Sequence, residues 1–160
     1  MSTFEINHVS IHADDLEESI AFYEDVLGME RIPSPNFEAP VEWLQCGDQQ
    51  LHLFDRDIEA SAYHHFGMTV EDFEAFFQTA QERKLFANWD DTDDLGVYSL
   101  PDGVVQAYLN DPAGNLIEVN HPNVETLDRE VRQYVVPRSE QFEQSGEAVE
   151  ATLRLSRRTD

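Results

Sequence analysis

Residues 8–16 read HVSIHADDL, and residues 65–73 read HFGMTVEDF. Each segment begins with a histidine, alternates between apolar and other residues, and ends on an acidic pair followed by a hydrophobic residue. The alternation is typical of a strand, and the acidic pair can cap a helix that follows it. The echo therefore predicts an internal repeat of two equivalent modules.

The ends of the two halves correspond as well. His52 lies between two leucines, and Glu118 lies between an isoleucine and a valine. Because strand side chains alternate between faces, the apolar neighbours point away from these two polar residues. Imidazole nitrogens and a carboxylate oxygen suit a borderline divalent metal. We therefore predict a metal site made of His8, His52, His65 and Glu118.

Both halves follow the same order of a strand, a helix and up to three strands. In the first half, we expect strands over residues 6–13, 29–32, 41–46 and 50–54 and a helix over 14–27. In the second half, we expect strands over 65–70, 97–100, 104–110 and 115–120 and a helix over 71–84. Prolines and glycines separate these elements.

The pattern changes after Pro122. Apolar spacing predicts a short amphipathic helix over residues 127–135, ending before Pro137, and a second one over 142–153. We interpret residues 123–160 as a helical extension that packs on the core or on a second subunit.

The charge balance is extreme, with 33 acidic against 10 basic residues and a formal net charge of −23. Such a charge argues against nucleic acid and anionic membranes as partners. Either the chain binds a basic partner, or it is adapted to molar salt, where the screening length falls to about 3 Å. The acids are spread along the whole chain, which favours a halophilic prokaryote with a salt-rich cytoplasm.

The other compositional signals point to the cytoplasm. No apolar run is long enough to span a membrane, and the first residues lack a signal pattern. Cys46 is the only cysteine, so no intrachain disulfide can form. We interpret Cys46 as a small hydrophobe at a strand end, not as a nucleophile.

Two further segments carry a family resemblance. These are Phe22-Tyr23 with Leu27-Gly28, and residues 111–118, which read DPAGNLIE. Together with the repeat, they resemble the vicinal oxygen chelate superfamily of glyoxalase I, methylmalonyl-CoA epimerase, extradiol dioxygenases, and fosfomycin and bleomycin resistance proteins. The resemblance covers about residues 4–122, with modules at about 4–57 and 64–122.

The resemblance implies an α+β fold in which two βαβββ modules form a curled, barrel-like mixed sheet around a metal. In many members this sheet is completed across a dimer, so a homodimer is expected. His8, His65 and Glu118 match the three metal positions of the family. His12, four residues beyond His8, is expected to face substrate or solvent.

Position 52 bears most on the activity. Glyoxalase I carries Glu there and the epimerase usually Gln, whereas extradiol dioxygenases have a histidine nearby that moves protons beside the iron. His52 and Tyr108, ten residues before Glu118, resemble the dioxygenase arrangement. One departure is that the dioxygenases carry a further histidine shortly before the tyrosine, where this chain has residues 100–102, LPD.

Three functions remain open from the sequence. The first is an extradiol-type dioxygenase with Fe(II) or Mn(II), in which His52 and Tyr108 transfer protons to and from a catechol-like substrate. The second is a glyoxalase- or epimerase-like lyase or isomerase, in which all four residues bind Ni, Co, Mn or Zn and stabilise an enediolate. The third is a non-catalytic drug-binding protein, which is disfavoured because burying four unpaired polar residues is costly.

Overall fold

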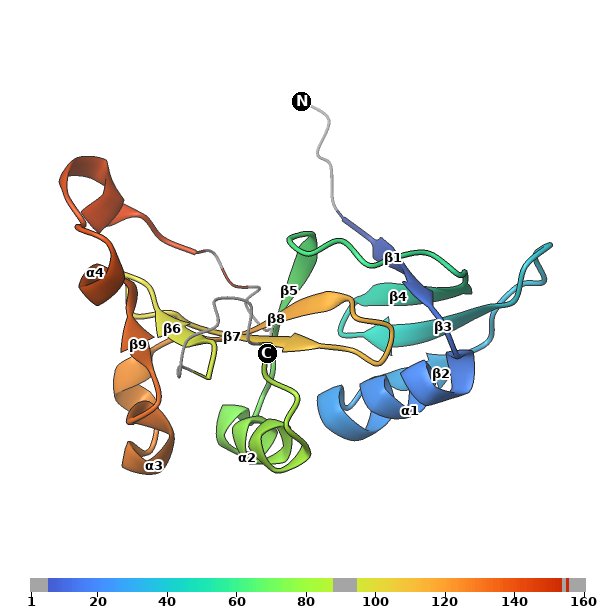
Figure 1. Cartoon of the computed structure of the whole chain (residues 1–160), viewed down its shortest axis with the longest axis horizontal. Coiled ribbons are helices and arrows are strands. Elements are labelled where there is room, and N and C mark those ends of the chain that lie inside the picture. Colours follow the sequence, from blue (N-terminus) through green and yellow to red (C-terminus); the bar gives the residue numbers. More distant parts are fainter. Residues whose placement is uncertain (1–5, 88–94, 154, 156–160) are drawn as a thin grey trace. The chain divides into compact units, whose positions relative to one another are not determined.

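The computed structural model describes residues 6–87, 95–153 and 155 (Figure 1). Its contacts divide the chain into two compact units. Unit 1 contains the described residues up to 64 together with 110–116, and unit 2 contains residues 65–109 and the described residues from 117 onward. Among the described residues, no helix has the length and apolar character that crossing a bilayer requires.

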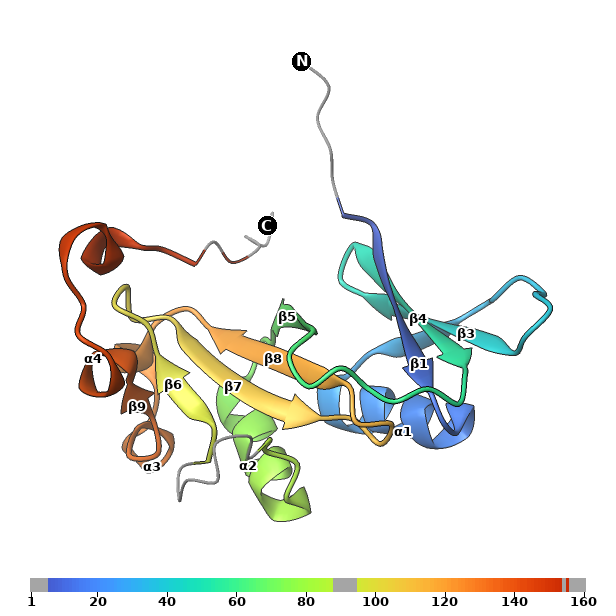
Figure 2. The ribbon, with the colours of Figure 1, turned by 45° about the horizontal axis from the view of Figure 1, so that its top comes forward.

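Unit 1 contains the first βαβββ module. Its elements are β1 (His8–Ala13), α1 (Leu16–Leu27), β2 (Glu30–Ile32), β3 (Val41–Cys46) and β4 (Gln49–Asp55). The sheet has the order β1-β4-β3-β2, with β1 parallel to β4 and the other pairs antiparallel. Strands β1, β4 and β3 are labelled in Figure 2. Helix α1 contacts β2, β3 and β4.

The ends of α1 are set by its sequence. Asp15 caps the first turn by accepting a hydrogen bond from the backbone N–H of Glu18 at 3.0 Å. Gly28 ends the helix in the left-handed region, with φ of 65°, which glycine adopts at little cost. Between these ends, the buried face contains Ile20, Phe22, Tyr23 and Val26. The helix expected from residue 14 thus begins two residues later, because Asp15 is its cap.

Unit 2 contains the second module, with β5 (His65–Thr69), α2 (Phe73–Arg83), β6 (Val97–Ser99), β7 (Val105–Asn110) and β8 (Leu116–His121). A short strand, β9 (Val136–Pro137), joins the sheet, whose order is β5-β8-β7-β6-β9. The predicted α+β class with two βαβββ modules is confirmed. In the described part of the chain, the strands form two sheets, of four and five strands, and no closed barrel.

The C-terminal segment is less helical than the sequence predicts. It contains the single turns α3 (Arg129–Arg132) and α4 (Arg138–Gln141) and two 3₁₀ turns, at Val124–Thr126 and Gly146–Glu150. Between α3 and α4, β9 pairs in parallel with β6, so that Val136 lies opposite Tyr98. The β-branched residues before Pro137 therefore extend the sheet and do not prolong a helix.

A buried hydrogen-bond cluster joins the two family segments within unit 1. Tyr23 donates from its hydroxyl to Asp111 Oδ2 at 2.7 Å. Asn115 donates from its backbone N–H to Asp111 Oδ1 and from its side chain to Oδ2, both at 2.8 Å. Burial, more than any other cause, raises the pKa of both Tyr23 and Asp111. These residues therefore hold the 111–114 turn against α1.

Replacing Tyr23 by Phe should lower the free energy of unfolding by about 1.5–3 kcal/mol, because buried Asp111 would lose a hydrogen-bond donor. Urea denaturation in molar salt measures the change. The matched control Tyr134→Phe removes a hydroxyl from a half-exposed ring and should stay within about 0.5 kcal/mol of wild type. Equal stabilities of the two variants would contradict the structural role of this cluster.

Candidate active site

The structure places the four predicted metal ligands as two pairs. His8, at the start of β1, and His52, in the middle of β4, belong to unit 1. His65, at the start of β5, and Glu118, in the middle of β8, belong to unit 2. Within the described residues, no group of three or more His, Cys, Asp or Glu side chains is close enough to hold a metal. A metal site that draws on both pairs stays a prediction.

In unit 1, His52 lies within a stack of rings. Trp43 is directly opposite His52 in the β3–β4 ladder, and their ring centroids are 4.2 Å apart with planes 6° from parallel. The His8 ring lies 4.4 Å from that of His52 at 17°. His52 Nε2 is 2.9 Å from Gln50 Oε1. Burial, and then the charge of His8, lower the pKa of His52, which favours a neutral imidazole at neutral pH.

The stack limits how this pair can bind a metal. An imidazole nitrogen binds a metal in the plane of its ring, at about 2.1 Å. Two nearly parallel rings 4.4 Å apart cannot both direct a nitrogen lone pair at one ion. In this arrangement either His8 or His52 can be a ligand, but not both together.

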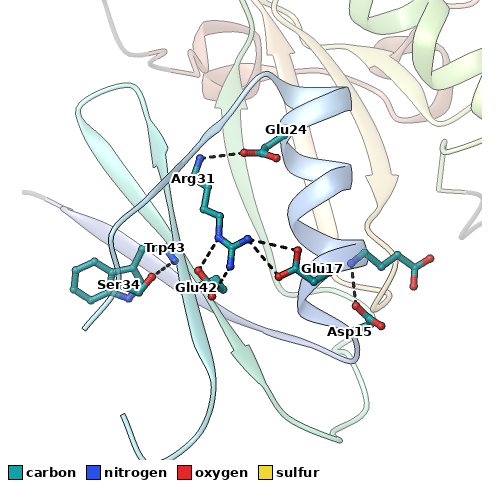
Figure 3. A network of polar contacts seen from close by, with 8 residues as sticks. Asp15, Glu17, Glu24, Arg31, Ser34, Glu42 and Trp43 are labelled. Carbon is teal, nitrogen blue, oxygen red and sulfur yellow. Dashed lines mark hydrogen bonds and ion pairs between the residues drawn. The ribbon is translucent and has the colours of Figure 1, made fainter. Parts of the chain in front are cut away.

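Ser34 fixes the strand that carries this stack. Its hydroxyl accepts a hydrogen bond from the backbone N–H of Trp43 at 2.9 Å, which ties the proline-rich loop to β3 (Figure 3). Next to Trp43 in β3, Glu42 forms an ion pair with Arg31 at 2.7 Å, and Arg31 forms a second ion pair with Glu17 at 3.3 Å. Arg31 is thus occupied by surface carboxylates.

In unit 2, Glu118 is buried and well supplied with donors. Its Oε1 accepts hydrogen bonds from Gln106 Nε2 at 3.0 Å and from Asn120 Nδ2 at 2.7 Å. Its Oε2 accepts one from the Tyr108 hydroxyl at 2.5 Å and lies 3.4 Å from His65 Nε2. Burial and the hydrogen bond to Glu118 raise the pKa of Tyr108, so the phenol stays protonated and acts as a donor.

Glu118 and His65 fit a shared divalent metal. Each carboxylate oxygen has two lone pairs, so Oε2 can accept the Tyr108 hydrogen bond and bind a metal through its second pair. Two ligands about 2.1 Å from a tetrahedral ion lie about 3.4 Å from each other. This equals the 3.4 Å between His65 Nε2 and Glu118 Oε2. The donor types and this spacing are thus compatible with two neighbouring ligands of one metal.

Gln106 and Asn120 are site residues that the sequence analysis missed. Their only signal in the sequence is a polar residue two positions from a predicted site residue. Gln106 lies two residues before Tyr108 on β7, and Asn120 lies two residues after Glu118 on β8, so each shares a strand face with its neighbour. Gly67 keeps this region open, because an added Cβ would lie 3.3 Å from Asn120 Oδ1 and 3.8 Å from Glu118 Oε1.

A cavity of about 560 Å³ opens over this pair within unit 2. Its size is typical of small-molecule sites, which span roughly 300–1,000 Å³. Polar side chains of β5, β7 and β8 form part of its lining, and Leu153 and Leu155 of the C-terminal segment form another part. The candidate ligands His65 and Glu118 are therefore accessible to a small molecule.

His12 and Cys46, which the sequence analysis also considered, are both shielded from solvent to some degree. His12 is only 7% exposed, which corrects the expectation that it could face solvent, and its Nε2 has no hydrogen-bond partner within the described residues. Cys46 ends β3 as expected. Burial raises the pKa of the Cys46 thiol, which opposes a nucleophilic role.

The known proteins that this chain resembles in sequence and in structure share one fold family. Human mitochondrial methylmalonyl-CoA epimerase is 26% identical over 129 residues, which is 71% of this chain and 72% of the epimerase. Lactoylglutathione lyase from Agrobacterium tumefaciens is 25% identical, with a TM-score of 0.56 over 74% of this chain and 94% of the lyase. The oxidase ChaP-H2 is 26% identical, with a TM-score of 0.61 over 76% and 97% of the two chains.

Metal binding occurs within the same fold. The fosfomycin resistance protein FosX from Listeria monocytogenes, in a complex with Mn(II), shares the fold with a TM-score of 0.58 at 13% identity, over 78% of this chain and 96% of FosX. The family model of the Glyoxalase/Bleomycin resistance protein/Dioxygenase superfamily matches residues 5–119. This range contains the first βαβββ module, the second module as far as Val119 in β8, and all four predicted ligands. The chain therefore belongs to the Glyoxalase/Bleomycin resistance protein/Dioxygenase superfamily.

Proposed function

We propose that this chain is a metal-dependent enzyme that acts on a small, metal-chelating substrate. The reaction that we favour is the extradiol-type oxygenation of a catechol-like compound. The observation that carries the proposal is the carboxylate of Glu118, fixed by three donors and spaced 3.4 Å from His65 Nε2 beside a cavity. A carboxylate held in this way is pre-oriented to bind a cation.

The proposed ligands are His8, His65 and Glu118, with His52 beside them. Fe(II) or Mn(II) is favoured, and Ni, Co or Zn is the alternative set. When bound, such a metal supplies a Lewis acid for the oxygen atoms of a chelating substrate. Three ligands from the protein leave coordination positions open for the substrate.

The chain's own residues have two tasks in this proposal. Gln106, Tyr108 and Asn120 hold Glu118 in one orientation through the hydrogen bonds described above. His52 accepts a proton from the substrate hydroxyl. With Nε2 donating to Gln50 Oε1, the lone pair for this step is on Nδ1, and the lowered pKa keeps it unprotonated.

The main alternative is a lyase or isomerase that stabilises an enediolate. The lactoylglutathione lyase and the methylmalonyl-CoA epimerase among the relatives support it. That reading needs His52 as a fourth ligand, which the stack of His52 on His8 disfavours. The likeness to the oxidase ChaP-H2 favours oxygen chemistry. A non-catalytic binding protein remains the third candidate, with no observation in its favour.

Oxygen uptake tests the proposal directly. Protein purified without oxygen, loaded with Fe(II) or Mn(II) and mixed with catechol should consume oxygen in proportion to ring-cleaved product. A parallel reaction with methylmalonyl-CoA in deuterated water reports enediolate chemistry through deuterium incorporation. Deuterium incorporation without oxygen uptake would replace the dioxygenase proposal by the isomerase.

We also propose a homodimer, as the family resemblance implies. Analytical ultracentrifugation in molar KCl should give about twice the chain mass of 18.4 kDa. A single species at the chain mass would overturn this part of the proposal.

The net charge of −23 should make stability depend strongly on salt. We propose that the chain works in a salt-rich cytoplasm. Because salt screens the repulsion among carboxylates, the melting temperature should rise steadily from dilute buffer to molar KCl. Differential scanning calorimetry measures this series, with sucrose as the uncharged control. A flat or falling series in KCl would leave a basic partner as the better explanation of the charge.

A further inference from the structure

The C-terminal segment is anchored to unit 2 at two places. Strand β9 pairs with β6, and the guanidinium of Arg138, just after β9, lies 3.6 Å from the centre of the Tyr98 ring. Further along, the backbone N–H of Leu153 donates to Asp102 Oδ2 at 2.9 Å. Asp102 lies in the turn between β6 and β7. The segment is thus fixed at residues 136–138 and at Leu153 to the sheet that carries Glu118 and to its β6–β7 turn.

The second anchor brings two apolar side chains to the cavity. Leu153 and Leu155 line the same cavity as His65, Tyr108 and Glu118, and both are partly buried. Other apolar residues of the segment, such as Phe142 and Val149, are 65% and 55% exposed. The segment therefore places these two leucines, and not its apolar residues in general, at the cavity.

The cavity has two chemically different sides. On the sheet side, Gln106, Asn120 and Tyr108 already direct hydrogen bonds at Glu118. The C-terminal segment adds the apolar side chains of Leu153 and Leu155 to the lining. A ligand group that reaches the leucines gains burial of apolar surface.

The family match ends at residue 119, before the segment begins. The apolar side of the cavity is therefore supplied by a part of the chain outside the family match. A change in this segment can alter which substrate fits without any change in the modules that carry the proposed ligands.

We infer that Leu153 and Leu155 form a wall of the substrate pocket and select substrates with an alkyl or similar apolar group. The selection rests on the proposed function, since it takes this cavity as the substrate site. The placement of the wall does not rest on the proposed function. The placement and the selection are therefore tested separately.

Thiol labelling tests the placement of the wall. In a Cys46→Ser background, Leu155→Cys and Val149→Cys each introduce one thiol into the same segment. With N-ethylmaleimide, the thiol at 155 should react on the order of 10-fold more slowly than the thiol at 149, because the cavity wall shields it. Equal rates would overturn the wall, whatever the enzyme does.

Ligand affinities test the selection. Two series, 4-alkylphenols and 4-alkylcatechols, are titrated by calorimetry into the anaerobic, Fe(II)-loaded protein. Each added methylene should tighten binding by about fourfold in both series. The double variant Leu153→Ala/Leu155→Ala should lose most of this gain, whereas Val149→Ala should keep it. Circular dichroism confirms that each variant is folded.

The two series separate the possible failures. Phenols cannot chelate a metal, so their dependence on alkyl length reports the wall alone. The extra affinity of catechols over phenols reports chelation, and its absence would count against the proposed function only. A dependence on alkyl length that is missing in wild type, or unchanged in the double variant, would overturn the selection by Leu153 and Leu155.

Discussion

His52→Ala is expected to keep its iron but to turn over a catechol about 10²–10⁴-fold more slowly than the wild-type chain, as for a lost acid–base group. The physical reason is the ring stack. His52 lies between Trp43 and His8 with its plane nearly parallel to both, and its Nε2 is engaged by Gln50. Such a histidine is placed to accept a proton and poorly placed to share a metal with His8.

The measurement is the oxygen-uptake rate beside the metal content of the same sample. His64→Ala is the matched control, since it removes an exposed histidine next to the second module and should leave both quantities unchanged. His52→Glu separates the two chemistries, because a glyoxalase-like site would accept a carboxylate ligand there. Loss of metal in His52→Ala, with metal retained in His52→Glu, would favour the lyase reading.

Glu118→Gln and His65→Ala are each expected to weaken metal binding by more than about 100-fold, since removing residues that merely support a ligand already costs 10–100-fold. Glu118→Gln is the sharper variant because it keeps the size of the side chain and removes the charge. Tyr108→Phe removes one supporting hydrogen bond of 2.5 Å to Glu118. It should therefore lower the metal affinity by about 10–100-fold.

Elemental analysis after dialysis, together with metal titration, gives these affinities. Glu17→Gln is the control, since that side chain is 77% exposed and its partner Arg31 belongs to a surface ion pair. Full metal occupancy in both Glu118→Gln and His65→Ala would rule out the proposed site. Unchanged affinity in Tyr108→Phe alone would limit the correction to the role of the tyrosine.

The sequence by itself determined the modules and their local signals. The repeat of residues 8–16 at 65–73 gave the βαβββ order, and Asp15 and Gly28 marked the ends of α1. The two-residue turn at Gly47 and Asp48 also sets the β3–β4 register, which puts Trp43 opposite His52. These features follow from alternation, capping and turn chemistry, which depend on neighbouring residues.

Only the tertiary structure decided what surrounds the candidate site. It packed Trp43, His52 and His8 into one stack, directed Gln106 and Asn120 at Glu118, and buried His12. It also turned the residues before Pro137 into a strand and brought Leu153 and Leu155 to the cavity. Each of these outcomes depends on pairing or packing between distant residues, and local periodicity carries no information about those partners.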